Sequence, residues 1–385
     1  MDGNFLKSQI ITYMGNKRKL LGQIGDLVDI VRSELSRDIT SADAFSGSGI
    51  VSRLLKTKSS HLFVNDLAGY SLTLNKCYLS TPSARERSNI AKFVVSANEF
   101  AHRKDLLGKG CKKGDVTPLV KRWIGEHWSP SGEIMKEDRA YFTEKNGLLI
   151  DRYRHFIKSV PEKYRHFLLA PLLVKCSIHN NTNGMFAAFY KDENGIGKYG
   201  GRKGIDLKRI TGDIVLEMPI FSPNPCKICV SKMDVQEWVD KIPPVDLIYL
   251  DPPYNKHPYS IYYFMLDIIN DWDTGVKIPP TNRGQPRNWT RSAYNSLTHA
   301  DKAFSDLIQS INAKFIILSY NNKGIIPIAR IVEVLSTKGM VYTFPVKHKT
   351  YNKLKGLASY KRKGDWSEVK EFLWLVDTRT SERII

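Results

Sequence analysis

Four consecutive residues, Asp251-Pro252-Pro253-Tyr254, directly follow an apolar run, Val245–Leu250, and their side chains could do chemistry together. The run predicts a buried strand of a parallel sheet, which stops at the prolines because neither has an N–H to donate to a neighbouring strand. An ionised Asp251 offers only hydrogen-bond acceptors, the proline carbonyls add further acceptors, and Tyr254 offers a flat face for stacking. The set therefore suits a planar group that carries an exocyclic NH2.

The amino group of a nucleobase fits this description best. Its nitrogen lone pair is delocalised into the ring and is a poor nucleophile. Acceptors that hold both amino hydrogens can pull the nitrogen towards a tetrahedral geometry and expose the lone pair. A proline turn that only ends a strand is the alternative, so the surrounding sequence has to decide between the two. The motif falls at the carboxyl end of a strand, where open α/β sheets bind their ligands.

Two glycines separated by one residue follow another predicted strand. Strand Ser41–Phe45 leads into Ser46-Gly47-Ser48-Gly49, and a helix is predicted over Ile50–Lys56. Strand, glycine-rich turn and helix form the first unit of a nucleotide-binding α/β fold, in which glycines let the backbone approach a ligand closely. The next predicted strand, His61–Val64, ends in Asn65-Asp66, and an acidic residue at that place commonly binds ribose hydroxyls. The order of these elements indicates a site for a cofactor that contains a nucleoside.

The elements that must position these residues alternate between strand and helix at both ends of the chain. Apolar spacing predicts helices at Leu20–Leu35, Gly69–Leu79, Val235–Lys241, Tyr259–Trp272, Asp301–Ile311 and Ile325–Leu335, and strands at Ile228–Lys232, Lys314–Ser319, Met340–Val346 and Phe372–Asp377. The last two strands are joined without a helix, which indicates an antiparallel pair at one edge. We therefore predict an α/β fold with a mostly parallel sheet and an antiparallel edge strand.

The alternation of strand and helix stops between residues 81 and 221, a basic segment rich in glycine, asparagine and aromatic residues. We predict one domain made of residues 1–80 and 222–385, and a mainly helical inserted domain at 81–221. Asp273–Leu297 is a polar loop, long for a compact domain and so functional or mobile. The whole chain is basic, with 58 Lys and Arg against 39 Asp and Glu and a formal net charge of +19. Such an excess indicates a polyanionic partner, although a membrane surface would also attract it.

No apolar run approaches the roughly 20 residues needed to span a bilayer, and the first residues lack the pattern of a signal peptide. We expect a cytoplasmic protein that does not bind membranes. An odd number of scattered cysteines, five in all, argues for reduced thiols. The pair Cys226 and Cys229 has no partner pair at zinc-finger spacing, so we interpret both as core residues and assign no metal.

Taken together, these motifs resemble those of the S-adenosylmethionine-dependent DNA adenine-N6 methyltransferases of the Dam-like group, in which the cofactor motif precedes DPPY and the recognition domain lies between them. Asp in the first place of DPPY points to adenine N6, because Ser is usual in enzymes that modify cytosine N4. The segment from Tyr13 to Lys17, YMGNK, resembles the motif that closes over the cofactor, and Asp43–Gly49 resembles its F-x-G-x-G loop. Ser319-Tyr320-Asn321 matches a further motif of the family.

The resemblance implies roles for individual residues. It implies catalysis by Asp251, Pro252, Pro253 and Tyr254. It implies binding of S-adenosyl-L-methionine by Tyr13, Lys17, Asp43, Phe45, Gly47, Gly49, Asp66, Asp234 and Asp251. For contacts to DNA we select basic and amide side chains of the insert and of two basic loops: Asn181, Asn183, Lys198, Arg202, Lys203, Arg287 and Lys349.

Two departures from the family pattern matter. Tyr13 stands where Trp is common, and the insert matches only loosely, chiefly around Asn181–Lys203. These departures concern the recognition sequence and not the reaction. The reaction that the resemblance implies is the site-specific methylation of N6 of an adenine that has flipped out of double-stranded DNA, within a restriction-modification system. The protein is expected to be a monomer, and any cognate restriction endonuclease is expected to act separately.

Other functions stay open at this point. Methylation of cytosine N4 or of adenine in RNA would use the same kind of site. A non-catalytic nucleic-acid-binding relative is a third possibility, against which the intact Asp251, Gly47, Gly49 and Asp66 argue.

Overall fold

The computed structural model describes residues 3–103, 122–201, 204–287, 289–346 and 370–379. Seven strands form one sheet in the order β3-β2-β1-β4-β5-β7-β6. They are β1 (Ile39–Asp43), β2 (Ser59–Asp66), β3 (Lys227–Lys232), β4 (Val245–Leu250), β5 (Ala313–Asn321), β6 (Met340–Val346) and β7 (Glu371–Asp377). All neighbours from β3 to β5 are parallel, whereas β7 runs antiparallel to both β5 and β6.

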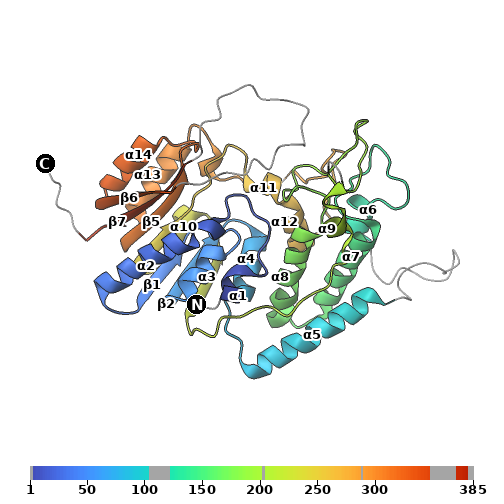
Figure 1. Ribbon diagram of the computed structural model, residues 1–385, viewed down its shortest axis with the longest axis horizontal. Helices are drawn as coiled ribbons and strands as arrows, with labels where there is room; N and C mark the ends of the chain where they lie inside the picture. Colours follow the sequence, from blue (N-terminus) through green and yellow to red (C-terminus); the bar gives the residue numbers. More distant parts are fainter. Residues whose placement is uncertain (1–2, 104–121, 202–203, 288, 347–369, 380–385) are drawn as a thin grey trace.

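Helices cover both faces of the sheet (Figure 1). On one face, α1 (Gly3–Lys7), α2 (Leu21–Leu35) and α3 (Ile50–Lys56) share a core with Leu247 and Tyr249 of β4. On the other face, α10 (Val235–Val239), α13 (Ala300–Ser310) and α14 (Ile328–Ser336) share a core with Ile248 and Leu250. Successive side chains from Leu247 to Leu250 thus enter opposite cores, which is why this part of the strand is apolar on both faces. The expected α/β fold of the Rossmann-like type is confirmed.

The strand order reverses between β1 and β4. The chain moves outward from β1 through β2 to β3, and then returns to place β4 on the other side of β1. Ligands of open α/β sheets bind at such a point, outside the carboxyl ends of the strands. The register brings these ends level, because Asp43 of β1 pairs with Val64 of β2 and with Tyr249 of β4.

The segment between β2 and β3 is mainly helical and lies beside the sheet (Figure 1). After α4 (Gly69–Tyr78), the described helices of this segment are α5 (Ala84–His102), α6 (Ile124–His127), α7 (Glu144–Ser159), α8 (Glu162–Ile178) and α9 (Leu207–Thr211). Apart from α9, they share one hydrophobic core with α4, which precedes the insert, and with α12 (Phe264–Asp271), which comes after β4 in the sequence. The insert is therefore packed continuously against the sheet-bearing part, and its boundaries at 81 and 221 stay a prediction.

One expected helix is interrupted. The pattern over Tyr259–Trp272 predicts a single helix, but the structure has α11 (Tyr259–Tyr262) and α12, separated at Tyr263 with φ −126° and ψ 17°. The Tyr263 hydroxyl accepts a hydrogen bond from the backbone N–H of Met14 at 2.6 Å. A contact with a distant segment therefore holds the ring at the place where the helix breaks. Other predicted boundaries agree with the structure to within a few residues.

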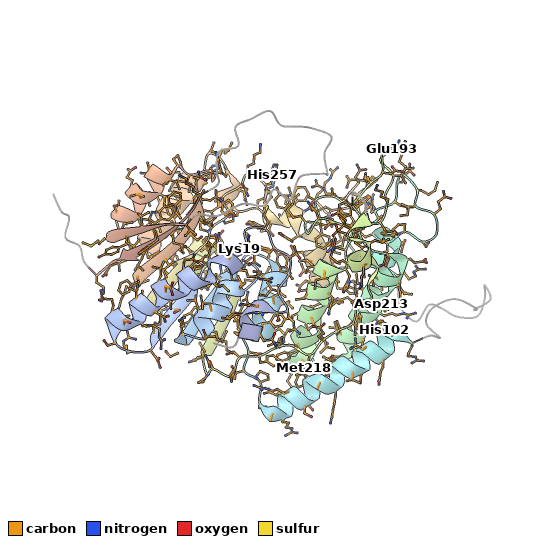
Figure 2. The ribbon with its side chains drawn as sticks, in the orientation of Figure 1. Lys19, His102, Glu193, Asp213, Met218 and His257 are labelled. Atoms are coloured by element: carbon orange, nitrogen blue, oxygen red, sulfur yellow. The ribbon has the colours of Figure 1, made fainter. Side chains whose placement is uncertain are left out.

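The loop between α12 and α13 contains a short 3-10 helix, η4 (Ala293–Asn295). Figure 2 shows His257 near the top centre of the molecule, between the sheet and the helical insert, and Glu193 at the outer end of the insert. Among the described residues, no helix combines the length and the apolar character that a membrane span requires.

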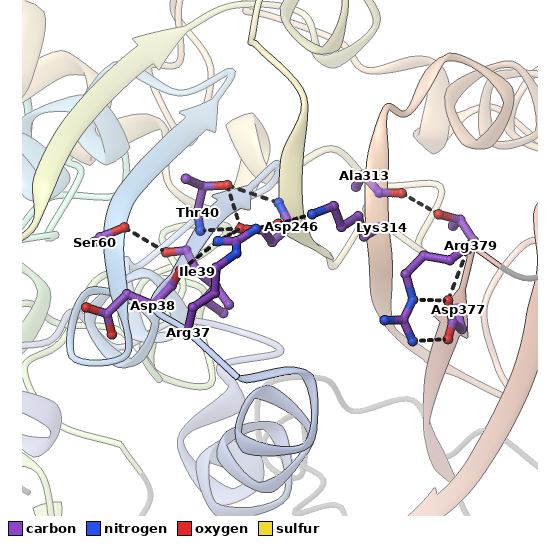
Figure 3. A network of polar contacts seen from close by, with 11 residues as sticks. Arg37, Asp38, Ile39, Thr40, Ser60, Asp246, Ala313, Lys314, Asp377 and Arg379 are labelled. Atoms are coloured by element: carbon purple, nitrogen blue, oxygen red, sulfur yellow. Dashed lines mark hydrogen bonds and ion pairs between the residues drawn. The ribbon is translucent and has the colours of Figure 1, made fainter. Parts of the chain in front are cut away.

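Asp246 in β4 shows how this fold satisfies a structural carboxylate (Figure 3). Its oxygens accept bonds from Arg37 Nη1 and Nη2 at 2.9 and 2.6 Å and from the Thr40 N–H at 3.0 Å, and Lys314 lies 3.0 Å away. Burial alone would raise the pKa of Asp246, but these partners lower it below its usual range. Asp251, at the opposite end of the same strand, has far fewer partners.

Candidate active site

Asp251 lies directly after β4, with Lys17 beside it. Its Oδ1 is 3.1 Å from Lys17 Nζ, and the same Nζ is 2.5 Å from Oε1 of Glu371, the first residue of β7. The contact with Asp251 is an ion pair without hydrogen-bond geometry, and Oδ1 has no hydrogen-bond partner among the described residues. Ser319 Oγ donates to the same Glu371 oxygen at 3.1 Å. One buried cation thus serves two carboxylates from different strands.

The charges of this group are strongly coupled. Burial raises the pKa of Asp251 to about 6, the attraction of Lys17 opposes the rise, and the neighbouring Glu371 carboxylate adds to it. Burial alone would lower the pKa of Lys17, but Asp251 and Glu371 together raise it above its usual value. Lys17, with 4 % of its side chain exposed, is therefore a permanent cation. Asp251 titrates within two pH units of neutrality and is mainly ionised at neutral pH.

Tyr254 is half-buried beside this ion pair. Its ring lies edge-on to Tyr320 with 5.8 Å between centroids, and Lys17 Nζ is 5.6 Å from its centroid. Gly15 lies against the Tyr254 hydroxyl with φ +76°, and a Cβ at Gly15 would approach that oxygen to 2.7 Å. A glycine is required at this position because both the backbone angle and the space exclude a side chain.

A cavity of about 350 Å³ opens at the carboxyl ends of the parallel strands. Five residues predicted to bind the cofactor line it: Tyr13, Phe45, Gly47, Asp66 and Asp234. The other four, Lys17, Asp43, Gly49 and Asp251, do not. Pro253 of the DPPY segment lines the cavity as well, so the segment and the glycine loop meet at one place.

Among the charged residues that line the cavity, carboxylates predominate. Asp267 and Asp271 of α12 and Asp273 join Asp66 and Asp234 there, against a single lysine, Lys232. Burial raises the pKa of Asp267 to about 7, and the nearby Asp271 contributes to the rise. A cavity with this wall favours a ligand that is positively charged or rich in hydrogen-bond donors.

Asp66 holds the glycine loop, and Asp43 holds the helix that follows it, α3. Asp66 accepts hydrogen bonds from the Gly47 N–H at 2.7 Å and the Ala68 N–H at 2.8 Å, and burial raises its pKa in spite of these bonds. Asp43 accepts from Ser52 Oγ at 2.5 Å, while its other oxygen is buried without a partner among the described residues. Burial raises the pKa of Asp43 to about 7.

The aromatic ring of Tyr13 packs against the glycine loop. Its ring stacks on Tyr263 and Tyr259 with centroid distances of 4.6 and 5.1 Å. A Cβ on Gly47, whose φ is +50°, would meet the Tyr13 ring at 2.9 Å. Phe45 lies edge-on to Tyr294 of η4, with 5.3 Å between centroids. Tyr13 and Phe45 are thus among the aromatic side chains that line the cavity beside its carboxylates.

The residues selected for DNA contacts separate into three groups. Lys198 and Arg287 are exposed and Asn183 is half-buried, whereas Arg202, Lys203 and Lys349 lie outside the described residues. Asn181 is fully buried. Its Nδ2 donates to the carbonyls of Ala140 and Lys198 at 2.8 Å, and its Oδ1 accepts from the Gly200 N–H at 3.1 Å. These bonds give Asn181 a structural role, which leaves its amide no free group for a base.

The interpretation of both cysteines of the 226–229 pair as core residues is wrong. Cys229 is exposed and Cys226 only half-buried, because β3 is an edge strand with solvent on part of its surface. Cys229 Sγ lies 3.5 Å from His61 Nε2 on the neighbouring strand.

Glu371, Asp267 and Gln285 are site residues that the sequence motifs do not reveal. Glu371 precedes a predicted strand and carries no motif, and only the pairing of β7 with β5 brings it to Lys17. Asp267 sits inside a helix predicted as aromatic-rich, and its direction could have been inferred from helical spacing relative to Phe264 and Ile268. Gln285 lies in the long loop, where neither spacing nor composition signals a role.

Fold and site define a Rossmann-like methyltransferase. The family model for D12 class N6 adenine-specific DNA methyltransferases matches residues 13–314, most of the chain, and the protein belongs to this family. The match confirms the resemblance to the adenine-N6 methyltransferases, and with it the assignment as an adenine-specific DNA methyltransferase.

Individual relatives cover the chain to similar extents. Type II methyltransferase M.NlaIII from Neisseria lactamica is 28 % identical over 336 residues, 86 % of this chain and 89 % of that protein. Type II methyltransferase M.CviAII from Paramecium bursaria Chlorella virus 1 is 24 % identical, over 89 % of this chain and 92 % of its own. Modification methylase StsI from Streptococcus sanguinis is 26 % identical over 88 % of this chain, which spans only 48 % of that relative.

Proposed function

We propose that this protein transfers a methyl group from S-adenosyl-L-methionine to N6 of an adenine flipped out of double-stranded DNA, as the modification enzyme of a restriction-modification system. The observation that carries the proposal is Asp251, a buried carboxylate at the end of β4, backed by Lys17 and placed beside an acidic cavity. The names of the type II relatives support the biological setting. The protein would act as a monomer, separately from any endonuclease.

The residues around the cavity fit this cofactor. When bound, S-adenosylmethionine supplies an activated methyl group on a positively charged sulfur. The acidic wall suits a cation, and Tyr13 and Phe45 can add cation–π attraction. Asp43 has a buried oxygen without a partner among the described residues, ready for a donor. Asp66 would take the ribose hydroxyls and Asp234 the adenine amino group.

At the target base, the chain supplies acceptors and a stacking face. Ionised Asp251 and the carbonyl of Pro252 would accept the two amino hydrogens and so free the nitrogen lone pair. Asp251 also stabilises the positive charge that develops on the nitrogen, which is electrostatic catalysis by a preorganised group. Lys17 holds the carboxylate in place and keeps it ionised. Tyr254 would stack on the flipped base.

Basic side chains would hold the phosphates. Lys198 and Arg287 are exposed and well placed for this, and the basic segment 347–363, with Lys349, would add to them together with Arg202 and Lys203. Asn183 stays a candidate for a base edge. We further propose that residues 81–221 select the target sequence.

The decisive test is incubation with labelled S-adenosylmethionine and duplex DNA, followed by digestion and identification of the labelled nucleoside. N6-methyladenosine in its deoxy form supports the proposal. Labelled N4-methylcytosine would instead support the alternative, in which the protein methylates the amino group of cytosine. A parallel incubation replaces the DNA by RNA, and label in the RNA only, or no label in the presence of bound DNA, would overturn the proposal.

Replacing Asp66 by Ala is expected to weaken cofactor binding roughly 10- to 150-fold, the equivalent of one hydrogen-bonded charge at about 1.5–3 kcal/mol. The variant loses the acceptor for the ribose and also releases the Gly47 N–H. Calorimetry with S-adenosylmethionine measures the first effect. Duplex affinity in the absence of cofactor should stay unchanged, and an unaltered cofactor affinity would count against the ribose role.

For Tyr254, Phe is expected to substitute well and Ala to lower productive binding about 5- to 150-fold, since base–aromatic stacking is worth about 1–3 kcal/mol per base. The defect of the Ala variant should shrink on a duplex with a mispaired target adenine, because a mismatched base flips at lower cost. Methylation rates on matched and mismatched duplexes measure both. An equal Ala defect on the two duplexes, with a lowered melting temperature, would assign Tyr254 to packing against Tyr320.

A further inference from the structure

A second cavity, of about 430 Å³, lies between the insert and the loop that follows α12. The insert contributes Tyr141 and the segment 187–191, and the loop contributes residues from Pro279 to Trp289. Gln285 and Trp289 also line the acidic cavity, so they form a wall shared by the two cavities. None of the residues 251–254 lines the second cavity, which is therefore distinct from the place proposed for the target adenine.

The two cavities have opposite charge. Apart from Tyr141, the ionisable residues that line the second cavity are Lys191, Arg283 and Arg287, and no carboxylate lines it. Within the described part of the chain, none of these three cations forms an ion pair with a carboxylate. Aromatic side chains, among them Trp289 and Phe189, line the same cavity, and Lys191 Nζ lies 5.0 Å from the centroid of the Phe189 ring. Cations interleaved with aromatic rings suit a ligand that combines a phosphate with a planar base.

The loop side of this cavity is fixed to the insert. Arg139 Nε donates to the carbonyl of Thr281 at 2.8 Å and its Nη2 to that of Pro279 at 3.0 Å, while Trp128 Nε1 donates to the carbonyl of Arg283 at 2.9 Å. The cavity is thus held open by hydrogen bonds between two segments far apart in sequence. Binding there requires little ordering of this part of the loop.

Gln285 adds an unused acceptor to the shared wall. The side chain is only 5 % exposed, and its Nε2 donates to the carbonyl of Ser260 at 2.8 Å. Its Oε1 is buried without a hydrogen-bond partner among the described residues. A buried acceptor of this kind is costly unless a ligand satisfies it, and the exocyclic amino group of a base can do so.

We propose that the second cavity binds one unstacked nucleotide of the substrate DNA other than the target adenine. Its base lies against Trp289, with Gln285 Oε1 available to an amino group, and its phosphate lies on Arg283, Arg287 and Lys191. The inference rests on the proposed function, because it takes duplex DNA as the substrate. Extruding this nucleotide adds sequence choice next to the methylated adenine.

The experiment combines protein variants with single abasic sites in the DNA. A duplex centred on the methylated site receives one abasic nucleotide at a time, and its affinity is measured by fluorescence anisotropy for wild type and for Trp289→Ala. At one position, the wild type should lose about 5- to 150-fold on base removal. At that position, the wild type and Trp289→Ala should bind the abasic duplex with equal affinity. At every other position, the loss of affinity caused by the variant and the loss caused by the missing base should multiply.

Further variants separate the contribution of stacking from those of charge and of folding. Trp289→Phe retains a ring and should keep most of the coupling, which separates stacking from a failure to fold. Arg283→Gln should weaken all duplexes and lower the slope of affinity against salt by about one. Lys277→Gln removes an exposed cation of the same loop outside the cavity lining and serves as the charge-matched control. It should show no coupling to any position.

Two results would overturn the inference. One is that the losses multiply at every position, so that no base contacts Trp289. The other is tight binding of free deoxynucleoside monophosphates that duplex DNA does not displace, which would make this a site for a free nucleotide. Both results are measured with protein that has been shown to methylate DNA, so neither of them contradicts the proposed function. A wild type that methylates no DNA would instead remove the proposed function itself.

Discussion

Asp251→Asn is expected to lower the rate of adenine methylation roughly 100- to 1000-fold, the usual loss when one preorganised electrostatic contact is removed. The amide keeps the size of the side chain but replaces a charged acceptor by a neutral group with its own donors. The positive charge that develops on the target nitrogen then has no opposing charge. Single-turnover rates with saturating cofactor and DNA measure the chemical step directly.

The same variant is expected to be at least as stable as the wild type. Burial raises the pKa of Asp251 to about 6 in the folded protein, above the unfolded value. Its contribution to stability is therefore present at low pH and lost as the pH rises through about 6, so above that pH the ionised carboxylate opposes folding. Lys17 keeps Glu371 as a partner in the variant. Melting temperatures above pH 7 test this, and near-normal turnover by the folded variant would remove Asp251 from the reaction.

Lys17→Met is expected to cost about 3–5 kcal/mol of folding stability at neutral to basic pH, because removing one partner from a buried ion pair leaves an uncompensated charge. Here two carboxylates, Asp251 and Glu371, lose their shared cation. Urea unfolding of the cofactor-free protein gives the free energy directly. A loss below about 1 kcal/mol would mean that the pair is effectively solvent-screened.

The pH dependence and a double variant serve as controls for Lys17. Without the lysine, the folded-state pKa of Asp251 rises above about 6, so the penalty should be largest at basic pH and should shrink as the pH falls through that raised pKa and Asp251 takes up a proton. Adding Glu371→Gln removes one of the two unpaired charges and should recover part of the stability. An identical penalty at acidic and basic pH would point to lost packing rather than lost charge.

Much of the site could be predicted from the sequence because its signals are local. An apolar run followed by two prolines has to end a strand, so the residue pattern alone places Asp251 at the carboxyl end of β4. Likewise, Gly47 and Gly49 between a strand and a helix require the close backbone approach that the structure has, with φ of +50° and +76°. Strand, turn and helix depend on neighbours along the chain, and such dependence is visible in the residue pattern.

Polar residues were harder to place. Asn181 lies in a basic, asparagine-rich segment typical of a nucleic-acid surface, yet its amide is buried and bonded to three backbone groups. Lys17, predicted to bind the cofactor, lies between Asp251 and Glu371, a position that its motif does not reveal. A polar side chain has the same sequence signature whether it is solvated or buried with partners, because the partners come from segments far away in the chain.

Residue patterns along the chain were sufficient to place the components of the candidate site at strand ends: the DPPY carboxylate, the glycine loop and the acidic residue that ends β2. The surroundings of that site follow from three-dimensional packing. The insertion of β7 between β5 and β6 brings Glu371 to Lys17, and the packing of the insert against the 279–287 segment creates the basic cavity. Strand order and loop docking are set by non-local pairing and by burial in shared cores, which local residue patterns do not encode.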